Sequence, residues 1–140
     1  MAQFEIATFY IDNYFLGIDL SFVQEINKNL NITKVFHAHD YILGVMNLRG
    51  DVIPVIDLGR KLGLGSRKIT KKSRNIILNY DSMKIGFLVD KIEDVILVAQ
   101  DDVSAPPSTF NEKEKNYFKA VVLLKDKLLS MVDIAEVFAK

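Results

Sequence analysis

Apolar residues along this chain come in short runs separated by small polar breaks, a spacing typical of strands joined by tight turns. Each break contains aspartate, in some cases with asparagine, serine or glycine, and these residues favour turns. Successive runs therefore predict hairpins, which we place at residues 4–11 with 14–20, 45–48 with 52–56, 75–80 with 83–90, and 120–124 with 128–132.

The segment from Asn47 to Asp57 carries the most specific pattern. Two β-branched runs flank a Gly50-Asp51 break, and Arg49 stands at that break without belonging to an apolar hairpin. Pro54 cannot donate a hydrogen bond to a ladder, so we expect its strand to be an edge strand or a bulge. Asp57 is the expected N-cap of a short helix over residues 57–62.

The remaining segments predict shorter elements. Ser21 with Gln24 three residues later favours a capped helical turn at the start of residues 21–26. Residues 32–36 and 92–98 are expected to be strands, and a short helix with Asp133 as N-cap is expected over residues 133–138. Residues 100–116 form the least regular connection. Many short strands at close spacing predict an all-β protein, built as small barrels or as a sandwich.

The chain also resembles itself. A shift of 69 positions takes Gly17 to Gly86, and a shift of 76 positions takes Asp57 to Asp133. Under these shifts each half contains a hairpin, an apolar-acidic-apolar segment, a second hairpin and a helix capped by aspartate. Because four kinds of element recur in one order, we predict two similar β subdomains that share one core.

The amino-acid composition argues against several classes of function. A chain of 140 residues is expected to form a single domain, residues 1–140, with an ample core from its 49% hydrophobic content. Without cysteine it has no thiol catalysis, cysteine-bound zinc or disulfides, which suits a reducing cytoplasm. Lys+Arg and Asp+Glu balance at 18 each, so net charge does not indicate nucleic acid. No apolar stretch approaches the roughly 18 residues that span a bilayer, and no signal peptide is recognised.

Candidate chemistry is sparse. His37 and His39 would share one face of a strand, yet no third metal ligand follows by spacing, so we expect no metal and no cofactor. The basic loop from Arg67 to Lys72 could contact phosphate, but it lacks interleaved aromatic residues, which favours a solvated loop. No nucleophile signature is present, and we expect no catalytic residue.

Arg49 is the charged residue with the largest number of possible roles. It could be a turn residue with its guanidinium in water, or a structural ion-pair partner of Glu25 or Asp57. It could also be a partner-facing donor, since arginine is favoured at interfaces.

Several motifs resemble one family. Residues 44–58 resemble the signature of the CheW-like coupling domain of bacterial chemotaxis. Residues 23–26, Val-Gln-Glu-Ile, resemble its Val-x-Glu-Ile segment, and residues 86–95 its Gly-x-x-Val-Asp stretch. Residues 131–133 stand where the family has Leu-Leu-Asp. Phe36 and His39 replace common prolines, which puts loop geometry rather than membership in question.

The resemblance implies a fold of two intertwined, five-stranded SH3-like barrels with short helices. It also implies a non-catalytic, cytoplasmic adaptor at membrane receptor arrays, without insertion into the membrane. The implied partners are the regulatory domain of the histidine kinase CheA and the cytoplasmic tip of a methyl-accepting chemoreceptor. The positions that it marks for partner contact or its support are Val23, Glu25, Ile26, Gly44, Asn47, Arg49 and Gly50.

Other functions stay open at this point. Within the same class, the chain could couple another chemosensory array, such as one governing surface motility. In a different class, it could be a small RNA-binding barrel that uses the loop from Arg67 to Lys72. An enzyme is the third alternative, against which the missing catalytic constellation argues.

Overall fold

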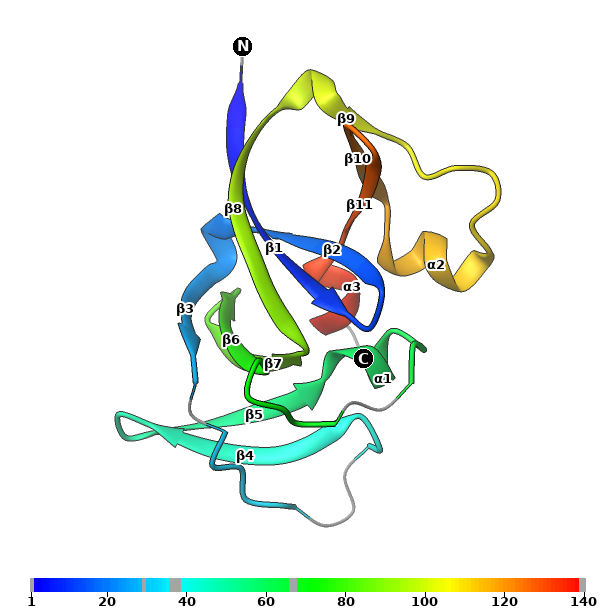
Figure 1. The fold of residues 1–140 in the computed structure, drawn as a ribbon. Helices are drawn as coiled ribbons and strands as arrows, with labels where there is room; N and C mark the ends of the chain where they lie inside the picture. Colours follow the sequence, from blue (N-terminus) through cyan, green and yellow to red (C-terminus); the bar gives the residue numbers. More distant parts are fainter. Residues whose placement is uncertain (1, 29, 36–38, 66–67, 139–140) are drawn as a thin grey trace. The chain divides into compact units, whose positions relative to one another are not determined.

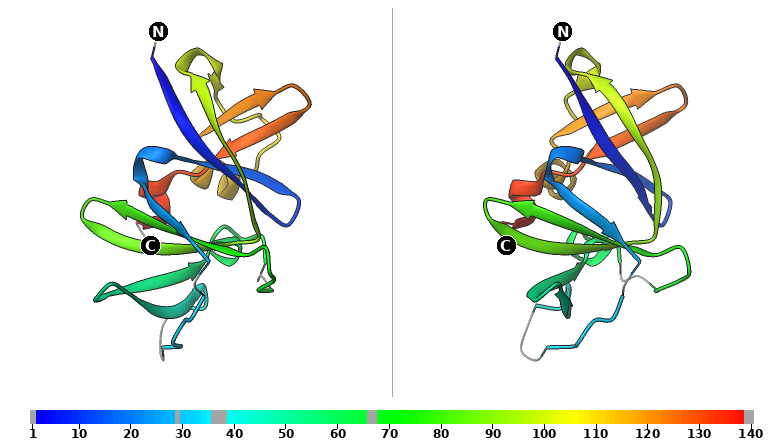
Figure 2. Two further views of the ribbon diagram at one scale, coloured as in Figure 1. Left: turned by 60° about the vertical axis from the view of Figure 1, so that its left-hand side comes forward. Right: turned by 90° about the vertical axis from the view of Figure 1, so that its left-hand side faces the viewer.

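The computed structural model describes residues 2–28, 30–35, 39–65 and 68–138. It divides into two compact units (Figures 1 and 2). Unit 1 comprises residues 1–21 and 93–140, and unit 2 comprises residues 22–92. The chain of unit 2 is thus inserted into that of unit 1. The described residues are mainly strands with a few short helices, so the all-β prediction is confirmed.

Unit 1 is built on a sheet with the strand order β8-β1-β2-β11-β10-β9. Its strands are β1 (Gln3–Ile11), β2 (Tyr14–Asp19), β8 (Lys91–Ala99), β9 (Val103–Ser104), β10 (Ala120–Leu124) and β11 (Lys127–Met131). The short helices are η2 (Gln100–Asp102), α2 (Glu112–Tyr117) and α3 (Ile134–Phe138). The two-residue β9 adds a sixth strand to the expected five.

Unit 2 is built on a five-stranded sheet with the order β3-β6-β7-β5-β4. Its strands are β3 (Val23–Asn27), β4 (Ile42–Leu48), β5 (Asp51–Asp57), β6 (Arg74–Tyr80) and β7 (Met83–Val89). The helix α1 (Leu58–Lys61) follows β5, and the 3-10 turn η1 (Leu20–Phe22) precedes β3. All the predicted hairpins are present, joined by turns in which several non-glycine residues have positive φ.

The internal repeat is visible in the register of the strands. In unit 1, the parallel pairing of β11 with β2 sets Met131 opposite Gly17. In unit 2, the parallel pairing of β5 with β7 sets Val55 opposite Gly86. These are equivalent positions under the two sequence shifts. Each unit therefore pairs the first hairpin of one repeat with the second hairpin of the other repeat, as expected for intertwined subdomains.

Each unit has its own cluster of buried apolar residues. In unit 1 the cluster contains Ile6, Val98, Val122 and Leu129. In unit 2 it contains Met46, Leu48, Ile53, Val55, Ile77 and Leu88. Burying each such side chain contributes about 1.5–3 kcal/mol. These clusters fix which face of each strand points outward.

One cap and one strand were predicted wrongly. The predicted helical turn at the start of residues 21–26 is present, but it covers Leu20–Phe22, and β3 follows from Val23. The turn is held by Asp19, whose Oδ1 accepts from the backbone N–H of Ser21 at 3.0 Å, so Ser21 is not the cap. Residues 32–35 form no strand, and only Thr33 makes an isolated bridge, to Val45. Residue 36 lies outside the described residues.

The prediction for Pro54 was also wrong, because β5 lies inside its sheet between β7 and β4. Pro54 opposes Val45 in the hairpin, at a position where neither residue bonds the other strand. Val45 instead exchanges both of its backbone hydrogen bonds with Thr33, at 2.8 Å each. The ladder with β7 begins only at Val55. The missing N–H of Pro54 therefore falls where no ladder needs it.

The short helices follow local signals. Asp57 accepts from the N–H of Arg60 and Asp133 from that of Glu136, both at 3.2 Å, which confirms both aspartate caps. The connection over residues 100–116 is more regular than expected, because α2 lies within it and extends past its end. A capping box formed by Asn111 and Glu114 starts α2, and that pattern was readable in the sequence.

Candidate partner-binding site

The β4–β5 hairpin of unit 2 ends in a two-residue turn formed by Arg49 and Gly50. Their φ angles are +49° and +90°, the pattern of a type I′ turn, which matches the twist of the two strands. Asn47 supports the turn, because its side-chain oxygen accepts from the N–H of Gly50 at 3.1 Å. Asn47, Arg49 and Gly50 therefore form one local structure, as the sequence predicted.

Arg49 forms an ion pair with Glu25 of β3. The strands β3 and β4 lie at opposite edges of the unit 2 sheet, so this contact requires the sheet to curl until its edges meet. The segment around Thr33, which follows β3 along the chain, pairs with β4 through the bridge between Thr33 and Val45. This closure gives unit 2 the barrel form. The alternative partner, Asp57, is buried and caps α1 instead.

The ion pair is an accessible one. The Arg49 side chain is 67% exposed and that of Glu25 is 27% exposed. Exposed pairs contribute only about 0–1 kcal/mol to stability, so the pair is a weak structural element. It does link the guanidinium group to β3 while most of the Arg49 side chain stays accessible. The arrangement can present a fork of N–H donors to a partner carboxylate.

The strand β3 carries the other predicted positions. A bulge lies between Val23 and Glu25, and such irregularities redirect side chains at sheet edges. Val23 is half-buried, whereas Ile26 is exposed on the strand that forms the sheet edge. An exposed apolar side chain beside unpaired backbone groups is a surface suited to a partner.

Gly44 has a different role from Gly50. A Cβ at Gly44 would lie 2.1 Å from the carbonyl oxygen of Thr33, so the close approach of the Thr33 segment requires glycine. A Cβ at Gly50 would have open space, and only its positive φ favours glycine. Gly44 lies at a register irregularity in β4, on the far side of the hairpin from the turn. It supports the fold rather than the exposed turn.

Sequence reasoning missed two neighbours of the turn. Val52 is 68% exposed and lies opposite Asn47. Asp51 pairs with Lys84 of β7 at 3.1 Å. The alternation along β5 is the signal for Val52, since burial of Ile53 and Val55 on one face leaves Val52 on the other.

Among the residues that the structure describes, the other candidate groups do not gather into a second site of this kind. His39 stacks on Tyr41 with a centroid distance of 5.1 Å, and His37 lies outside the described residues. Within residues 2–28, 30–35, 39–65 and 68–138, no group of three His, Cys, Asp or Glu side chains could hold a metal ion. No helix within the same ranges is long and apolar enough to cross a membrane.

The basic loop is only partly described, because Arg67 lies outside the described residues. Lys68, Lys71 and Lys72 are exposed. Arg74 is held by two backbone carbonyls, those of Lys71 and Ser73, at 2.8 and 2.7 Å. This anchoring reduces the freedom of its guanidinium group to follow a nucleic-acid backbone.

Comparisons with known proteins agree with the fold and indicate the family. The CheW-like domain matches residues 5–140. The chain is 33% identical to the chemotaxis protein CheW of Treponema pallidum, over 98% of this chain and 83% of that protein. It is also 33% identical to that of Bacillus subtilis, over 94% of this chain and 85% of that protein.

A solved structure extends the likeness to three dimensions. The scaffolding protein TtCheW of Thermoanaerobacter tengcongensis superposes with a TM-score of 0.89 at 29% identity, covering 99% of this chain and 94% of that one. Family match, relatives and structure agree along nearly the whole length. The chain belongs to the CheW-like family of chemotaxis proteins.

Proposed function

We propose that this protein is a non-catalytic adaptor that couples methyl-accepting chemoreceptors to the histidine kinase CheA. The observation that carries the proposal is the exposed Arg49 guanidinium, held by Glu25 at the edge of the unit 2 barrel. Arg49 and Glu25 both lie in segments that resemble the family's signature motifs. The position of the adaptor is the cytoplasmic end of the receptor array, with the regulatory domain of the kinase as the second partner.

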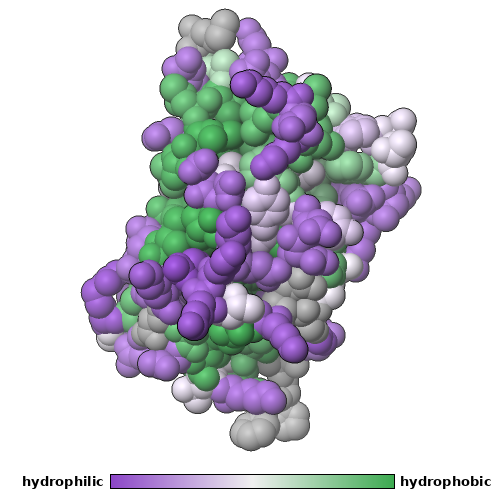
Figure 3. All heavy atoms as spheres, viewed as in Figure 1, coloured by the Kyte–Doolittle hydropathy of each residue, from purple (hydrophilic) through white to green (hydrophobic). Residues whose placement is uncertain are grey.

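One edge strand of each sheet, β3 and β8, supports an adaptor. Ile26 of β3 and Val95 of β8 are equivalent under the 69-residue shift, and they are 39% and 49% exposed. Leu97, also on β8, is 63% exposed. Figure 3 shows hydrophobic surface in the region where Figure 1 draws β8. Each unit thus offers an edge strand with exposed apolar side chains, and a protein with two such edges suits two partners.

The test replaces the guanidinium without disturbing the fold. We expect Arg49→Ala to weaken receptor control of kinase activity at least about tenfold in a reconstituted assay of receptor, kinase and adaptor, because an interface arginine can contribute 2 kcal/mol or more. Its unfolding free energy should change by no more than about 1 kcal/mol, since the lost ion pair is exposed.

Lys125→Ala is the matched control. Lys125 occupies the equivalent turn of the β10–β11 hairpin, also with positive φ, so both variants remove a basic side chain from the same kind of turn. We expect Lys125→Ala to leave receptor control unchanged. If the two variants behave alike, or if Arg49→Ala keeps full receptor control, the role given to Arg49 is wrong.

Two further measurements separate the adaptor from the alternative functions. A coupling protein of another array would bind a receptor and kinase pair from that array in place of the chemotaxis pair. An RNA-binding barrel would show affinity for single-stranded RNA that falls with rising salt and is lost in Lys71→Ala/Lys72→Ala. Salt-dependent RNA binding without receptor control would replace the adaptor proposal.

A further inference from the structure

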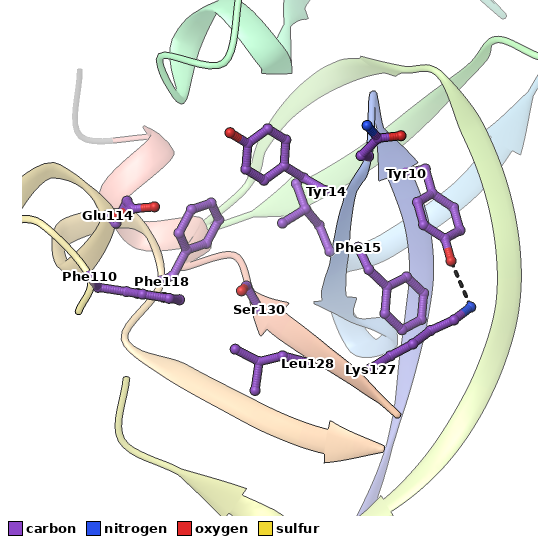
Figure 4. A pocket seen from close by; sticks show the side chains of 11 residues that line it. Tyr10, Tyr14, Phe15, Phe110, Glu114, Phe118, Lys127, Leu128 and Ser130 are labelled. Carbon is purple, nitrogen blue, oxygen red and sulfur yellow. Dashed lines mark hydrogen bonds between the residues drawn. The ribbon is translucent and has the colours of Figure 1, made fainter. Parts of the chain in front are cut away.

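Unit 1 contains a pocket of about 390 Å³, and none of its described lining residues belongs to the candidate partner-binding site. It lies between the β1–β2 hairpin, β11 and the segment around α2 (Figure 4). Its volume falls in the range of small-molecule sites, about 300–1,000 Å³. Within unit 1, residues far apart in the sequence thus converge on one hollow.

Aromatic rings form two facing walls of this pocket. Tyr10 and Phe15 contact each other with a centroid distance of 5.1 Å, and Phe110 and Phe118 form an edge-to-face pair at 6.4 Å. Figure 4 shows the two pairs on opposite sides, with Ser130 between them. The gap between two aromatic walls is suited to a flat apolar body, because aromatic groups pack well in offset or edge-to-face contact.

Lys127 supplies a positive charge at one end of the pocket. Its Nζ donates to the hydroxyl of Tyr10 at 2.8 Å and lies 5.0 Å from the centroid of the Phe15 ring. The negative charges of Glu93 and Asp126 also act on this ammonium group. The hydrogen bond to Tyr10 raises the pKa of Lys127 above its ordinary value, so the group stays charged at neutral pH.

The opposite end carries Glu114, the only acidic residue among the described residues that line the pocket. Its Oε1 accepts from the N–H of Asn111 at 2.8 Å, which fixes the carboxylate in the capping box of α2. The two ends therefore differ in charge. A bound anion gains at the Lys127 end and is repelled at the Glu114 end, which sets the direction of a ligand in the pocket.

We infer that this pocket binds a small aromatic carboxylate, with its ring between the two aromatic walls and its carboxylate on the ammonium group of Lys127. The ammonium group has donors to spare, since Tyr10 takes one of three. The hydroxyl of Ser130, between the walls, can add a hydrogen bond to the ligand. A neutral or cationic ligand of the same shape would lack the attraction between a carboxylate and the ammonium group of Lys127.

The test compares three probes of one shape by NMR titration of the isotope-labelled full chain. The probes are 3-phenylpropionate, its neutral amide, and 3-phenylpropylamine. We expect 3-phenylpropionate to bind with a dissociation constant of about 1 mM, a range ordinary for so small a molecule. The amide should bind about tenfold more weakly and the amine more weakly still. The shifted signals should be those of Phe15, Phe118 and Ser130.

Variants of the two charged residues separate a built site from loose apolar contact. Lys127→Met should abolish the preference for the carboxylate over the amide, and Lys127→Arg should keep it. Glu114→Gln should tighten 3-phenylpropionate about twofold, because glutamine preserves the capping box while the repulsion is lost. Lys125→Met, on the same hairpin but outside the pocket, should change nothing.

Three results would overturn the inference. The first is the absence of saturable shifts with 3-phenylpropionate. The second is equal binding of the three probes, which would make the pocket only an apolar surface. The third is shifts that map to unit 2. Unchanged spectra of the variants away from the pocket establish that each one is folded.

Discussion

At the scale of single residues, the hairpin turns hold several non-glycine residues in the left-handed backbone region. Asp12, Arg49, Asp81, Ser82 and Lys125 all have positive φ. That region costs a non-glycine residue about 1 kcal/mol or more. Asparagine or glycine would relieve the strain at position 49, yet the turn carries an arginine. Because Lys125 occupies the equivalent turn, a basic residue there is partly a property of the repeat, and the ion pair with Glu25 is what distinguishes Arg49.

The two glycines of the candidate site should respond very differently to alanine. Gly44→Ala places a Cβ against the carbonyl oxygen of Thr33. Because this is a backbone atom, it cannot move aside easily, so we expect the free energy of unfolding to fall by about 3 kcal/mol or more. Gly50→Ala meets only open space and a positive φ, so we expect a loss of about 1 kcal/mol. Urea unfolding of the two variants measures both values.

The same pair of variants separates structure from recognition. Gly50→Ala, if folded, should retain receptor control, because the Arg49 side chain is still held by Glu25. Equal losses of stability at the two positions would show that the contact between Gly44 and Thr33 is not a constraint. Loss of receptor control in a stable Gly50→Ala protein would make the exact turn geometry part of the binding surface.

At the scale of elements, local signals predicted the parts whose hydrogen bonds are local. The hairpins and the helices capped by Asp57 and Asp133 depend on neighbouring residues, and they were predicted correctly. The region around Ile32 was not, because its apolar residues pack against the unit 2 core without joining a ladder. Pro54 was misjudged because the direction of a missing N–H depends on strand register, which residue type alone does not determine.

The helix α3 depends on charges that can be tested by pH. Asp133 is the N-cap of α3, and the Nζ of Lys119 lies 3.1 Å from its carboxylate and 3.8 Å from the carboxylate of Glu136. The hydrogen bond to Asp133 and its negative charge raise the pKa of Lys119. A raised lysine pKa means that the stabilisation is present at neutral pH and is lost as pH rises through the folded-state pKa.

We therefore expect Lys119→Met to melt at a slightly lower temperature than the wild type at pH 7, by at most about 2 °C for an exposed pair. The difference should shrink as the pH is raised above about 10.5, where the unfolded lysine titrates. Melting followed by circular dichroism at a series of pH values measures this. Lys113→Met on α2 is the control and should show no such trend. A difference that grows at high pH would contradict the assignment.

At the scale of the whole molecule, the candidate site could be foreseen in part. The sequence placed Asn47, Arg49 and Gly50 in one turn, and it offered Glu25 or Asp57 as the partner of Arg49. Only the fold decides between them, because it is the closing of the unit 2 sheet that brings β3 to the β4–β5 turn. The aromatic pocket of unit 1 was not foreseen, since its walls come from segments about 100 residues apart.

The order of the chain makes the stability of one unit depend on the other. Unit 1 consists of two segments joined only through residues 22–92, which form unit 2. If unit 2 unfolds, that join becomes a flexible loop of about 70 residues, whose closure costs roughly 4 kcal/mol. This is a large part of the 5–15 kcal/mol by which a typical domain is stable. We therefore propose that residues 1–140 fold as one cooperative domain.

The proposal predicts that a core lesion in unit 2 is felt in unit 1. Ile77 is fully buried in the unit 2 core, so Ile77→Ala should cost about 2–5 kcal/mol. We expect amide hydrogen exchange of β1, which lies in unit 1, to accelerate by at least about tenfold in this variant, since the exchange-competent state becomes easier to reach. Leu123→Ala, at a position 73% exposed on unit 1, should leave β1 exchange within about twofold of wild type. Exchange of β1 that is unchanged in Ile77→Ala, while β6 exchanges faster, would mean that the two units unfold independently and that the inserted topology does not enforce a single transition.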